Sequence, residues 1–233
     1  MILEQLNESD ILLQHSTKYQ DVLITEIDGL RSLYLDGDLQ FDDDNESYYH
    51  TQMIKNLNEY IGGIKNSNVC VMGGGDGGIA RELLKYNPKY IKLIEIDPEI
   101  VDICTKYFPV LNNNGEVFKQ IDVHHMDAME YLKGDIKLDS VILDISIPYE
   151  ESFKENQICK SFVDSLVGKV DVISWLISYK SAHLLDFNIF SSFKHYTAYK
   201  VHVPRYEHNE IINIVAKLWV DYTVSHGEID IPI

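Results

Sequence analysis

Short apolar runs alternate with helical patterns from residue 69 onward, and this alternation predicts the core of the fold. Residues 70–72 and 91–96 are apolar runs of the kind found in buried strands. Between them, residues 79–86 carry apolar side chains at helical spacing, and Pro88 ends that helix. A strand, a helix and a second strand in this order are typical of a βαβ unit with parallel strands.

The same alternation continues along the chain and predicts a parallel sheet with helices on both faces. The chain is therefore expected to be an α/β protein with a doubly wound, mostly parallel, Rossmann-like sheet. No internal repeat and no low-complexity linker interrupts it. We expect helices at 98–108, 128–132 and 184–193, and strands at 117–123, 140–144, 170–178, 198–203 and 212–222.

The N-terminal part shows a different pattern, which predicts a small β unit. Residues 22–27 and 31–35 are strand-like and flank Asp28-Gly29, a dipeptide that favours a hairpin turn. We therefore divide the chain into an N-terminal β-hairpin unit at 1–52 and a Rossmann-like domain at 53–233.

An acidic run lies near the end of the N-terminal unit. Residues 42–46 read DDDNE, and their composition predicts a solvated loop. Residues 51–60 then carry apolar side chains at helical spacing, and Gly62-Gly63 is expected to end that helix.

The composition indicates a globular protein in a reducing compartment. Hydrophobic residues make up 45% of the 233, yet no apolar run approaches the ~20 residues needed to cross a bilayer. The N-terminus has neither the basic start nor the long apolar stretch of a signal peptide. Cys70, Cys104 and Cys159 are too few and too widely spaced for a disulfide framework or a zinc site. We expect a cytoplasmic protein.

The net charge narrows the range of partners. The formal charge is −17, from 37 acidic and 20 basic residues. Such a charge disfavours nucleic acid and anionic membranes as partners. It suits a cationic small-molecule substrate, although a solvated acidic surface would give the same value.

A glycine turn follows the first predicted strand of the sheet. Gly73, Gly75 and Gly78 fit G-x-G-x-x-G, a pattern that allows a tight turn and close approach of a ligand. Asp76 lies inside this turn, where it would repel a pyrophosphate and attract a cationic ligand tail. No Lys-Ser or Lys-Thr follows, which excludes a P-loop. A sulfonium nucleoside therefore fits the turn best, and the alternative is that Asp76 only caps the helix.

Carboxylates recur at the ends of the predicted strands. They are Asp76, Glu95, Asp127 and Asp144. In an open parallel sheet these ends face one crevice, where ligands bind, and an acid about 20 residues beyond the glycines can accept hydrogen bonds from ribose hydroxyls. Four acids in one crevice favour a ligand that is cationic or rich in hydroxyls. Each acid by itself could instead be a helix cap.

These motifs resemble those of the spermidine synthases, the aminopropyltransferases of polyamine synthesis. Residues 73–78 (GGGDGG) followed by 95–98 (EIDP) resemble the family's central motif, which methyltransferases share in part. Three further motifs of the family have counterparts in the same order, at residues 19–23 (YQDVL), 34–40 (YLDGDLQ) and 106–109 (KYFP). The resemblance is dense from about residue 20 to 144 and implies a methyltransferase-type sheet.

The resemblance implies how the nucleoside would be held. Decarboxylated S-adenosylmethionine, or S-adenosylmethionine, would be the co-substrate and methylthioadenosine the product, with no tightly bound cofactor. Glu95 would hold the ribose hydroxyls and Asp127 the adenine amino group. Gln20 would contact the nucleoside, and Asp76 the amino end of the aminopropyl arm. The glycines Gly73, Gly75 and Gly78 and the side chain of His50 would complete the donor site.

On the amine side, the resemblance implies that Asp144 acts on the attacking amine and that Tyr49 and Tyr206 contact it. Tyr49-His50 stands where relatives have a Tyr-His or Tyr-Gln pair that enters the active site. An alkyl amine has a pKa of about 10.4, so it must lose a proton before it attacks the sulfonium carbon. A carboxylate that accepts this proton contributes typically 10²–10⁴-fold. The resemblance also implies a homodimer.

No metal is expected. The reaction needs alignment and proton transfer, neither of which requires an ion. His124 and His125 are adjacent, so they point apart on a strand and make a poor pair of ligands.

The amine side departs from the family pattern. The family's D-x-x-D-P is Asp144–Pro148 here, with Ile147 in place of the second acid, and residues 149–152 replace a Gly-Pro stretch. Near Tyr206, residues 207–209 replace Pro-Ser-Gly. Three hypotheses follow: an altered amine acceptor, S-adenosylmethionine itself as donor (for methyl transfer, cyclisation or elimination), or a nucleoside-binding subunit without turnover.

Overall fold

The computed structural model describes residues 7–145, 153–178, 195–203 and 210–217. Two sheets are present among them. The smaller is antiparallel, with the order β1-β2-β3-β4. Its strands are β1 (Ile11–Ser16), β2 (Asp21–Ile27), β3 (Leu30–Leu35) and β4 (Asp38–Asp42), and a 3₁₀ turn, η2 (Glu8–Asp10), precedes them.

The larger sheet has seven strands in the order β10-β11-β9-β8-β5-β6-β7. The five strands from β9 to β7 are parallel, and β10 and β11 are antiparallel additions at one edge. This arrangement confirms the predicted mostly parallel, doubly wound sheet. The strands are β5 (Asn68–Gly73), β6 (Tyr90–Glu95), β7 (Asp122–His125), β8 (Leu138–Asp144), β9 (Val170–Ser178), β10 (His195–His202) and β11 (Glu210–Lys217).

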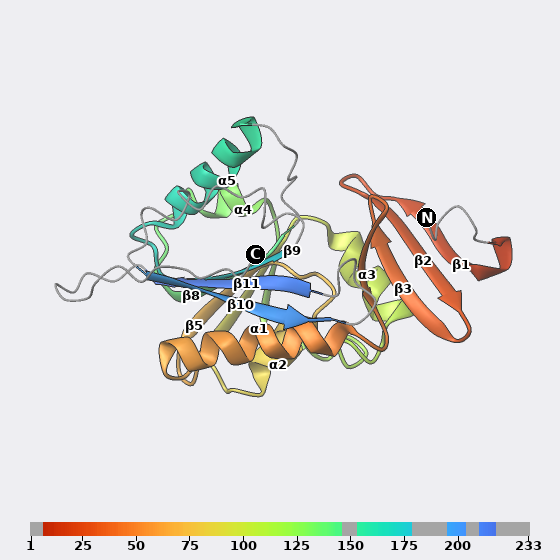
Figure 1. Ribbon diagram of the computed structural model, residues 1–233, viewed down its shortest axis with the longest axis horizontal. Coiled ribbons are helices and arrows are strands. Elements are labelled where there is room, and N and C mark those ends of the chain that lie inside the picture. Colours follow the sequence, from red (N-terminus) through yellow and green to blue (C-terminus); the bar gives the residue numbers. More distant parts are fainter. Residues whose placement is uncertain (1–6, 146–152, 179–194, 204–209, 218–233) are drawn as a thin grey trace.

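Helices cover both faces of the larger sheet (Figure 1). On one face lie α1 (Glu46–Ile61) and α2 (Gly78–Leu84), and on the other lie α4 (Ala128–Tyr131) and α5 (Phe153–Leu166). The strand β5 shows why both faces are apolar: Val69 and Val71 pack toward α1 and α2, whereas Cys70 and Met72 pack toward α5. A strand buried on both faces reads as a continuous apolar run, which is the pattern in the sequence.

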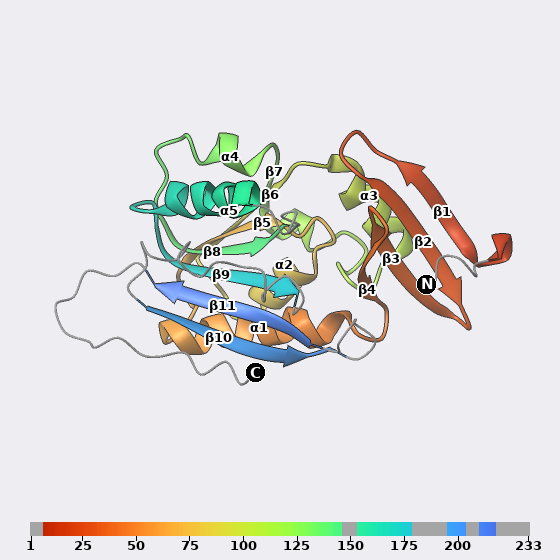
Figure 2. The ribbon, with the colours of Figure 1, turned by 45° about the horizontal axis from the view of Figure 1, so that its top comes forward.

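The helix α3 (Pro98–Tyr107) lies between the two sheets (Figure 2). Its residues Ile100 and Cys104 share a buried cluster with Val22 and Ile24 of the small sheet. The ring of Phe41 meets that of Phe108 edge-on, with centroids 4.8 Å apart. The small sheet is therefore packed against the larger part of the molecule through an apolar interface.

Most predicted elements are present, and the turns at Asp28-Gly29 and Asp36-Gly37 have the positive φ angles of hairpin turns. The predicted strand at 117–123 is wrong. Residues 118–120 form a 3₁₀ turn, η3 (Phe118–Gln120), and the strand begins only at Asp122. Val117 is buried but lies outside the sheet, so the apolar side chain that suggested an earlier strand start belongs to the segment before η3. The predicted helix at 184–193 lies outside the described residues.

The helix α1 begins five residues earlier than predicted, at Glu46. The acidic run before it is only partly solvated: Asp43 and Asp44 are exposed, but Asp42 and Asn45 are buried. Asp42 accepts hydrogen bonds from the backbone and side chain of Asn45, which fixes the entry to the helix. Because α1 runs through residue 52, the expected domain boundary falls within a helix, and the division into two domains stays a prediction.

Two strands and one α-helix had no counterpart in the predictions: β1, β4 and α5. Each depends on packing or pairing that the local pattern does not reveal. Among the described residues, no helix combines the length and hydropathy required to span a membrane.

The interface between the sheets can be tested by replacing Phe41, which is 1% exposed. We expect Phe41→Ala to lower the free energy of unfolding by about 3–5 kcal/mol, because it removes buried contacts and leaves a cavity. Urea unfolding followed by circular dichroism would measure this. Val110→Ala, at a side chain 83% exposed, is the control and should change the value by less than about 0.5 kcal/mol. A loss for Phe41→Ala no larger than this control would contradict the packing described.

Candidate active site

The strands β8, β5 and β6 end at one level. Met72 pairs with both Leu143 and Ile94, and Gly73 pairs with Asp144, so Asp144, Gly73 and Glu95 stand side by side. The chain passes from β5 outward to β6 and β7 and then returns to β8 on the other side of β5. Open α/β sheets bind ligands at such a switch in strand order. The predicted glycine turn and two of the predicted acids therefore lie at the expected crevice.

The glycine turn connects β5 to α2 and passes close to its neighbours. Gly73 has a φ of +80°, and a Cβ atom there would lie 2.0 Å from the carbonyl oxygen of Asp144. A Cβ at Gly75 would lie 2.9 Å from the side chain of Glu95. Only glycine fits at Gly73, where the turn passes directly against the backbone of β8, and a Cβ at Gly75 would force the side chains of Glu95 and Ile100 to shift.

Glu95 is buried at the end of β6, where its carboxylate is held by backbone N–H groups. Gly75 N donates to Oε2 at 3.0 Å, and Asp97 N donates to Oε1 at 2.9 Å. Burial nevertheless raises the pKa of Glu95 to about 7, because desolvation outweighs these hydrogen bonds and the nearby acids add to it. The carboxylate is thus fixed in position and sits next to the glycine turn.

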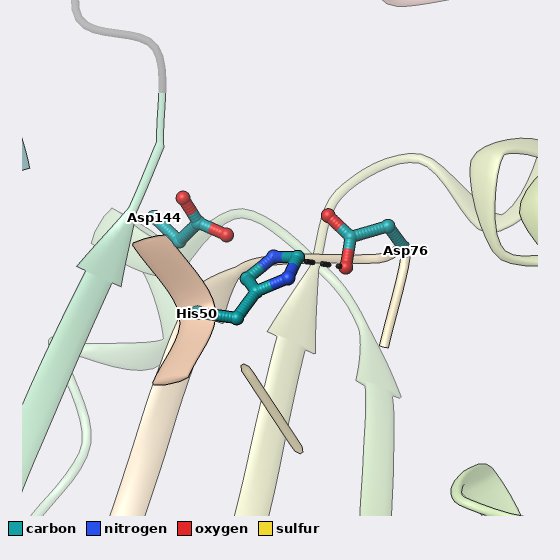
Figure 3. Close-up of side chains that lie close together, drawn as sticks. All are labelled: His50, Asp76 and Asp144. Carbon is teal, nitrogen blue, oxygen red and sulfur yellow. Dashed lines mark ion pairs between the residues drawn. The ribbon is translucent and has the colours of Figure 1, made fainter. Parts of the chain in front are cut away.

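Three side chains from distant parts of the sequence converge beside the turn. Figure 3 shows the imidazole of His50 between the carboxylates of Asp76 and Asp144. One possible ligand atom from each of the three lies within 4.8 Å of the other two. His50 comes from α1, Asp76 from the glycine turn and Asp144 from the last position of β8. His50 Nε2 lies 3.7 Å from Asp76 Oδ1.

The charged groups of this cluster shift one another's pKa values. Burial and the charge of Asp76 raise the pKa of Asp144 to about 7, although His50 opposes the shift. Burial lowers the pKa of His50, but Asp76, Glu46 and Asp144 together outweigh it and raise that pKa. Asp76 also accepts a hydrogen bond from Gly78 N at 2.6 Å, so it caps the turn and faces the cluster at once.

Glu46 and Arg81 support the cluster, and both were missed from the sequence. Glu46 Oε2 lies 2.6 Å from His50 Nδ1, and Arg81 contacts both oxygens of Glu46 at 2.9 Å. Burial alone would raise the pKa of Glu46, but His50 and Arg81 lower it to about 2. The spacing Glu46-x-x-x-His50 would have revealed the first contact had α1 been predicted to start at residue 46.

The remaining predicted site residues lie in different places. Gln20 donates to Asp97 Oδ2 at 3.0 Å, which brings the small sheet to the end of β6. Tyr49 is buried in the interface between the sheets, with its ring against that of His50. Asp127 is exposed and caps α4 by accepting a hydrogen bond from Met129 N at 2.6 Å, so it is not part of the cluster. Tyr206 lies outside the described residues.

The cluster could hold a cation. Two carboxylates and an imidazole are the acceptors that an ammonium group or a divalent metal ion would use. The expectation that the protein uses no metal stays a prediction. Glu95 ends the next strand, so a further buried carboxylate lies beside this cluster.

Comparison with known proteins identifies a family model that matches this chain. The model is the spermine/spermidine synthase domain, and it matches residues 46–218. A polyamine aminopropyltransferase of Prochlorococcus marinus is 33% identical over 147 residues, which are 61% of this chain and 51% of that protein. One from Oceanobacillus iheyensis is 28% identical over 157 residues, which are 65% of this chain and 30% of that protein. The chain thus spans about half the length of these relatives or less.

Solved structures agree on the fold. A spermidine synthase from Thermotoga maritima superposes with a TM-score of 0.75 at 21% identity, covering 91% of this chain and 73% of that one. A spermidine synthase in complex with the transition-state analogue AdoDATO superposes equally well.

The raised pKa of Glu95 has a consequence for stability. Its carboxyl has a pKa of about 7 in the folded protein and about 4.5 when unfolded, so folding binds a proton between these values and stability falls as the pH rises through them. The substitution Glu95→Gln removes this pH-dependent contribution to stability, because glutamine does not titrate. We expect the free energy of unfolding of Glu95→Gln, relative to that of the wild type, to be larger at pH 8 than at pH 5, by up to about 3 kcal/mol.

Urea unfolding at the two pH values would measure the difference. The exposed Glu116→Gln is the matched control and should show no comparable trend. An equal effect of Glu95→Gln at both pH values would show that Glu95 titrates normally.

Proposed function

The chain belongs to the spermine/spermidine synthase family, and from this premise we propose that it transfers an aminopropyl group from decarboxylated S-adenosylmethionine to an amine. The observation that carries the proposal is the pairing of Asp76 with Asp144 around His50 beside the glycine turn. The donor's aminopropyl arm ends in an ammonium group, which two carboxylates attract.

The charges around the cluster favour the decarboxylated donor over S-adenosylmethionine itself. The intact molecule carries a carboxylate next to its amino group, and that carboxylate would meet Asp76 and Asp144. Arg81 is the nearby cation, but Glu46 and Glu82 already bind its guanidinium. A further anion in the crevice would therefore be repelled.

The proposed reaction assigns separate roles to the acids. Glu95 accepts hydrogen bonds from the ribose hydroxyls, with Gln20 and the glycine turn on the nucleoside side and Asp127 for the adenine amino group. Asp144 takes a proton from the attacking amine, whose lone pair then forms the new N–C bond. The C–S bond breaks with its electrons on sulfur, and methylthioadenosine leaves. The raised pKa of Asp144 in the ligand-free site makes it a stronger base than an ordinary carboxylate.

The acceptor is proposed to differ from that of the relatives. The second acid of the family's motif is Ile147 here, so one ammonium group of a diamine would lose its partner. An amine with a different length or charge is the substrate that this change suggests, with Tyr49 and Tyr206 among its contacts. A cytoplasmic homodimer is the assembly that the resemblance suggests, and light scattering of the purified protein would test the dimer.

The test of the donor is calorimetric binding of three nucleosides side by side. We expect decarboxylated S-adenosylmethionine to bind more tightly than S-adenosylmethionine, with methylthioadenosine also binding. Preference for S-adenosylmethionine would instead support methyl transfer, cyclisation or elimination. Binding of all three without any transfer to a panel of amines would support a subunit without turnover.

The role of Asp144 can be separated from that of the nucleoside site. We expect Asp144→Asn to lower kcat by at least about 10²-fold, because the amide cannot accept the proton. The Kd for methylthioadenosine should change little, since this ligand lacks the aminopropyl arm. Steady-state transfer assays and calorimetry would measure the two quantities. Equal loss of binding and turnover would contradict the assignment.

A further inference from the structure

The connection between β1 and β2 is hydrogen-bonded to a buried carboxylate in the larger part of the molecule. Thr17 and Gln20 stand at the two ends of this connection, and both donate to Asp97 Oδ2, at 2.7 and 3.0 Å. Asp97 follows β6 and is fully buried. Thr17 lies outside residues 46–218, the region that the family model matches. The small sheet therefore reaches the end of β6 through two side-chain donors.

The hydroxyl of Thr17 directs its hydrogen toward that carboxylate. A hydroxyl donates one hydrogen bond and can accept two. Tyr19 N and Gln20 N donate to Thr17 Oγ1 at 3.0 and 3.1 Å, and these bonds use its acceptor capacity. The carbonyl oxygen of Gln20 lies 3.2 Å from Oγ1, whereas Asp97 Oδ2 lies at 2.7 Å. Because hydrogen bonds to a carboxylate are shorter and stronger than those to a neutral carbonyl, the hydrogen points to Asp97.

Asp97 connects this contact to Glu95. The N–H of Asp97 donates to Glu95 Oε1 at 2.9 Å, while its Oδ1 accepts from Glu99 N at 3.1 Å and caps α3. With Thr17 and Gln20 on Oδ2, each oxygen of the Asp97 carboxylate is bound. The side chain is thereby held from two directions, and the backbone of the same residue holds Glu95.

The orientation of Glu95 depends on this N–H group. Its carboxylate is buried, and Gly75 N holds Oε2 while Asp97 N holds Oε1. Loss of a hydrogen bond to a buried charged group is costly, so the carboxylate follows its donors when they move. A change in the orientation of residue 97 would therefore redirect the oxygens of Glu95.

We propose that Thr17 is a positioning residue for the nucleoside site, because by fixing Asp97 it aims the carboxylate of Glu95 at the ribose hydroxyls of the ligand. The inference rests on the proposed function, which assigns those hydroxyls to Glu95, and deepens it by adding a residue from the small sheet. The small sheet then takes part in ligand recognition, besides packing against α3.

The apolar interface does not supply this orientation by itself. Val22 and Ile24 pack in the cluster with α3 through apolar side chains, whose contacts are not directional. At the opposite end of α3, Arg31 donates to the carbonyl oxygen of Tyr107 at 2.8 Å. Arg31 thus joins the small sheet to α3 at a distance from Asp97, which makes it a matched control.

Calorimetry with two nucleosides measures the role of Thr17. The probes are methylthioadenosine and its 2′,3′-dideoxy analogue, which lacks both ribose hydroxyls. The ratio of their Kd values measures recognition of ribose. We expect Thr17→Val, which keeps the shape and removes the hydroxyl, to reduce this preference for methylthioadenosine by about threefold to tenfold, less than the loss of a direct hydrogen bond to a charged group. The Kd of the analogue should change little.

Two further variants give the controls. Thr17→Ser restores the hydroxyl and should keep the wild-type preference. Arg31→Gln weakens the contact at the other end of α3 and should also keep it, whatever its effect on urea unfolding. If Arg31→Gln lowers the preference as much as Thr17→Val, docking of the small sheet is what matters and the positioning role is wrong.

A double-mutant cycle tests whether Thr17 acts through Asp97. Asp97→Asn keeps the backbone N–H that holds Glu95 and an oxygen for the cap of α3, but its NH₂ group stands where Thr17 and Gln20 donate. This variant alone should lower the preference at least as much as Thr17→Val. In its background we expect Thr17→Val to change the preference by no more than about twofold. Equal reductions in both backgrounds would show that Thr17 acts independently of Asp97 and would overturn the inference.

The outcomes separate this inference from the proposed function. If the wild type prefers methylthioadenosine and Thr17→Val keeps that preference, the assignment of Glu95 to ribose stands and the role of Thr17 fails. If Thr17→Val weakens both nucleosides equally, Thr17 only supports the fold, and the positioning role is wrong. If the wild type binds both nucleosides equally, the inference fails together with the ribose role of Glu95, while the choice of donor is still decided by the comparison of decarboxylated and intact S-adenosylmethionine.

Discussion

Mutual repulsion among carboxylates that share one buried crevice is the constraint around which this site is built. Asp76 and Asp144 face the same imidazole, and Glu95 ends the neighbouring strand. Burial and like charges raise the pKa of both Asp144 and Glu95 to about 7. Such an arrangement lowers the stability of the folded protein near neutral pH, and in exchange it preorganises acceptors for a cationic ligand.

Hydrogen bonds and close packing hold these groups in place. Backbone N–H groups of the glycine turn hold Glu95, and the backbone of Gly78 supports the ring of His50. The pair Glu46–Arg81 joins α1 to α2, the two helices that cover the same face of the sheet. The contact that connects the helices therefore also directs the imidazole toward the carboxylates.

The connection between β1 and β2 of the small sheet is hydrogen-bonded next to the end of β6. Gln20 and Thr17 both donate to Asp97, which follows β6 and caps α3. The apolar interface behind these hydrogen bonds keeps the sheet against α3. The residues that resemble the family most closely lie on the side proposed to bind the nucleoside, whereas the departures gather on the side proposed to bind the amine. This distribution suits a protein that keeps the donor and changes the acceptor.

The sequence alone predicted the parallel sheet, the glycine turn and the convergence of Asp76 and Asp144 at one crevice. These features follow from local patterns: apolar runs, a turn that requires glycine, and acids placed at strand ends. The early start of α1 could not be predicted in this way. Its first turn carries polar and aromatic residues without helical periodicity, and it is stabilised by Arg81, 35 residues from Glu46 in sequence.

The arrangement of side chains around His50 was likewise decided only by the tertiary structure. Asp127, which follows β7, is an exposed cap of α4, and its contact with the adenine amino group stays a prediction. The structure places His50 between two carboxylates, a position that depends on how α1 packs across the sheet. The local spacing of apolar residues indicates whether a segment is a helix or a strand. Contacts between distant elements depend on packing that no short stretch of sequence contains.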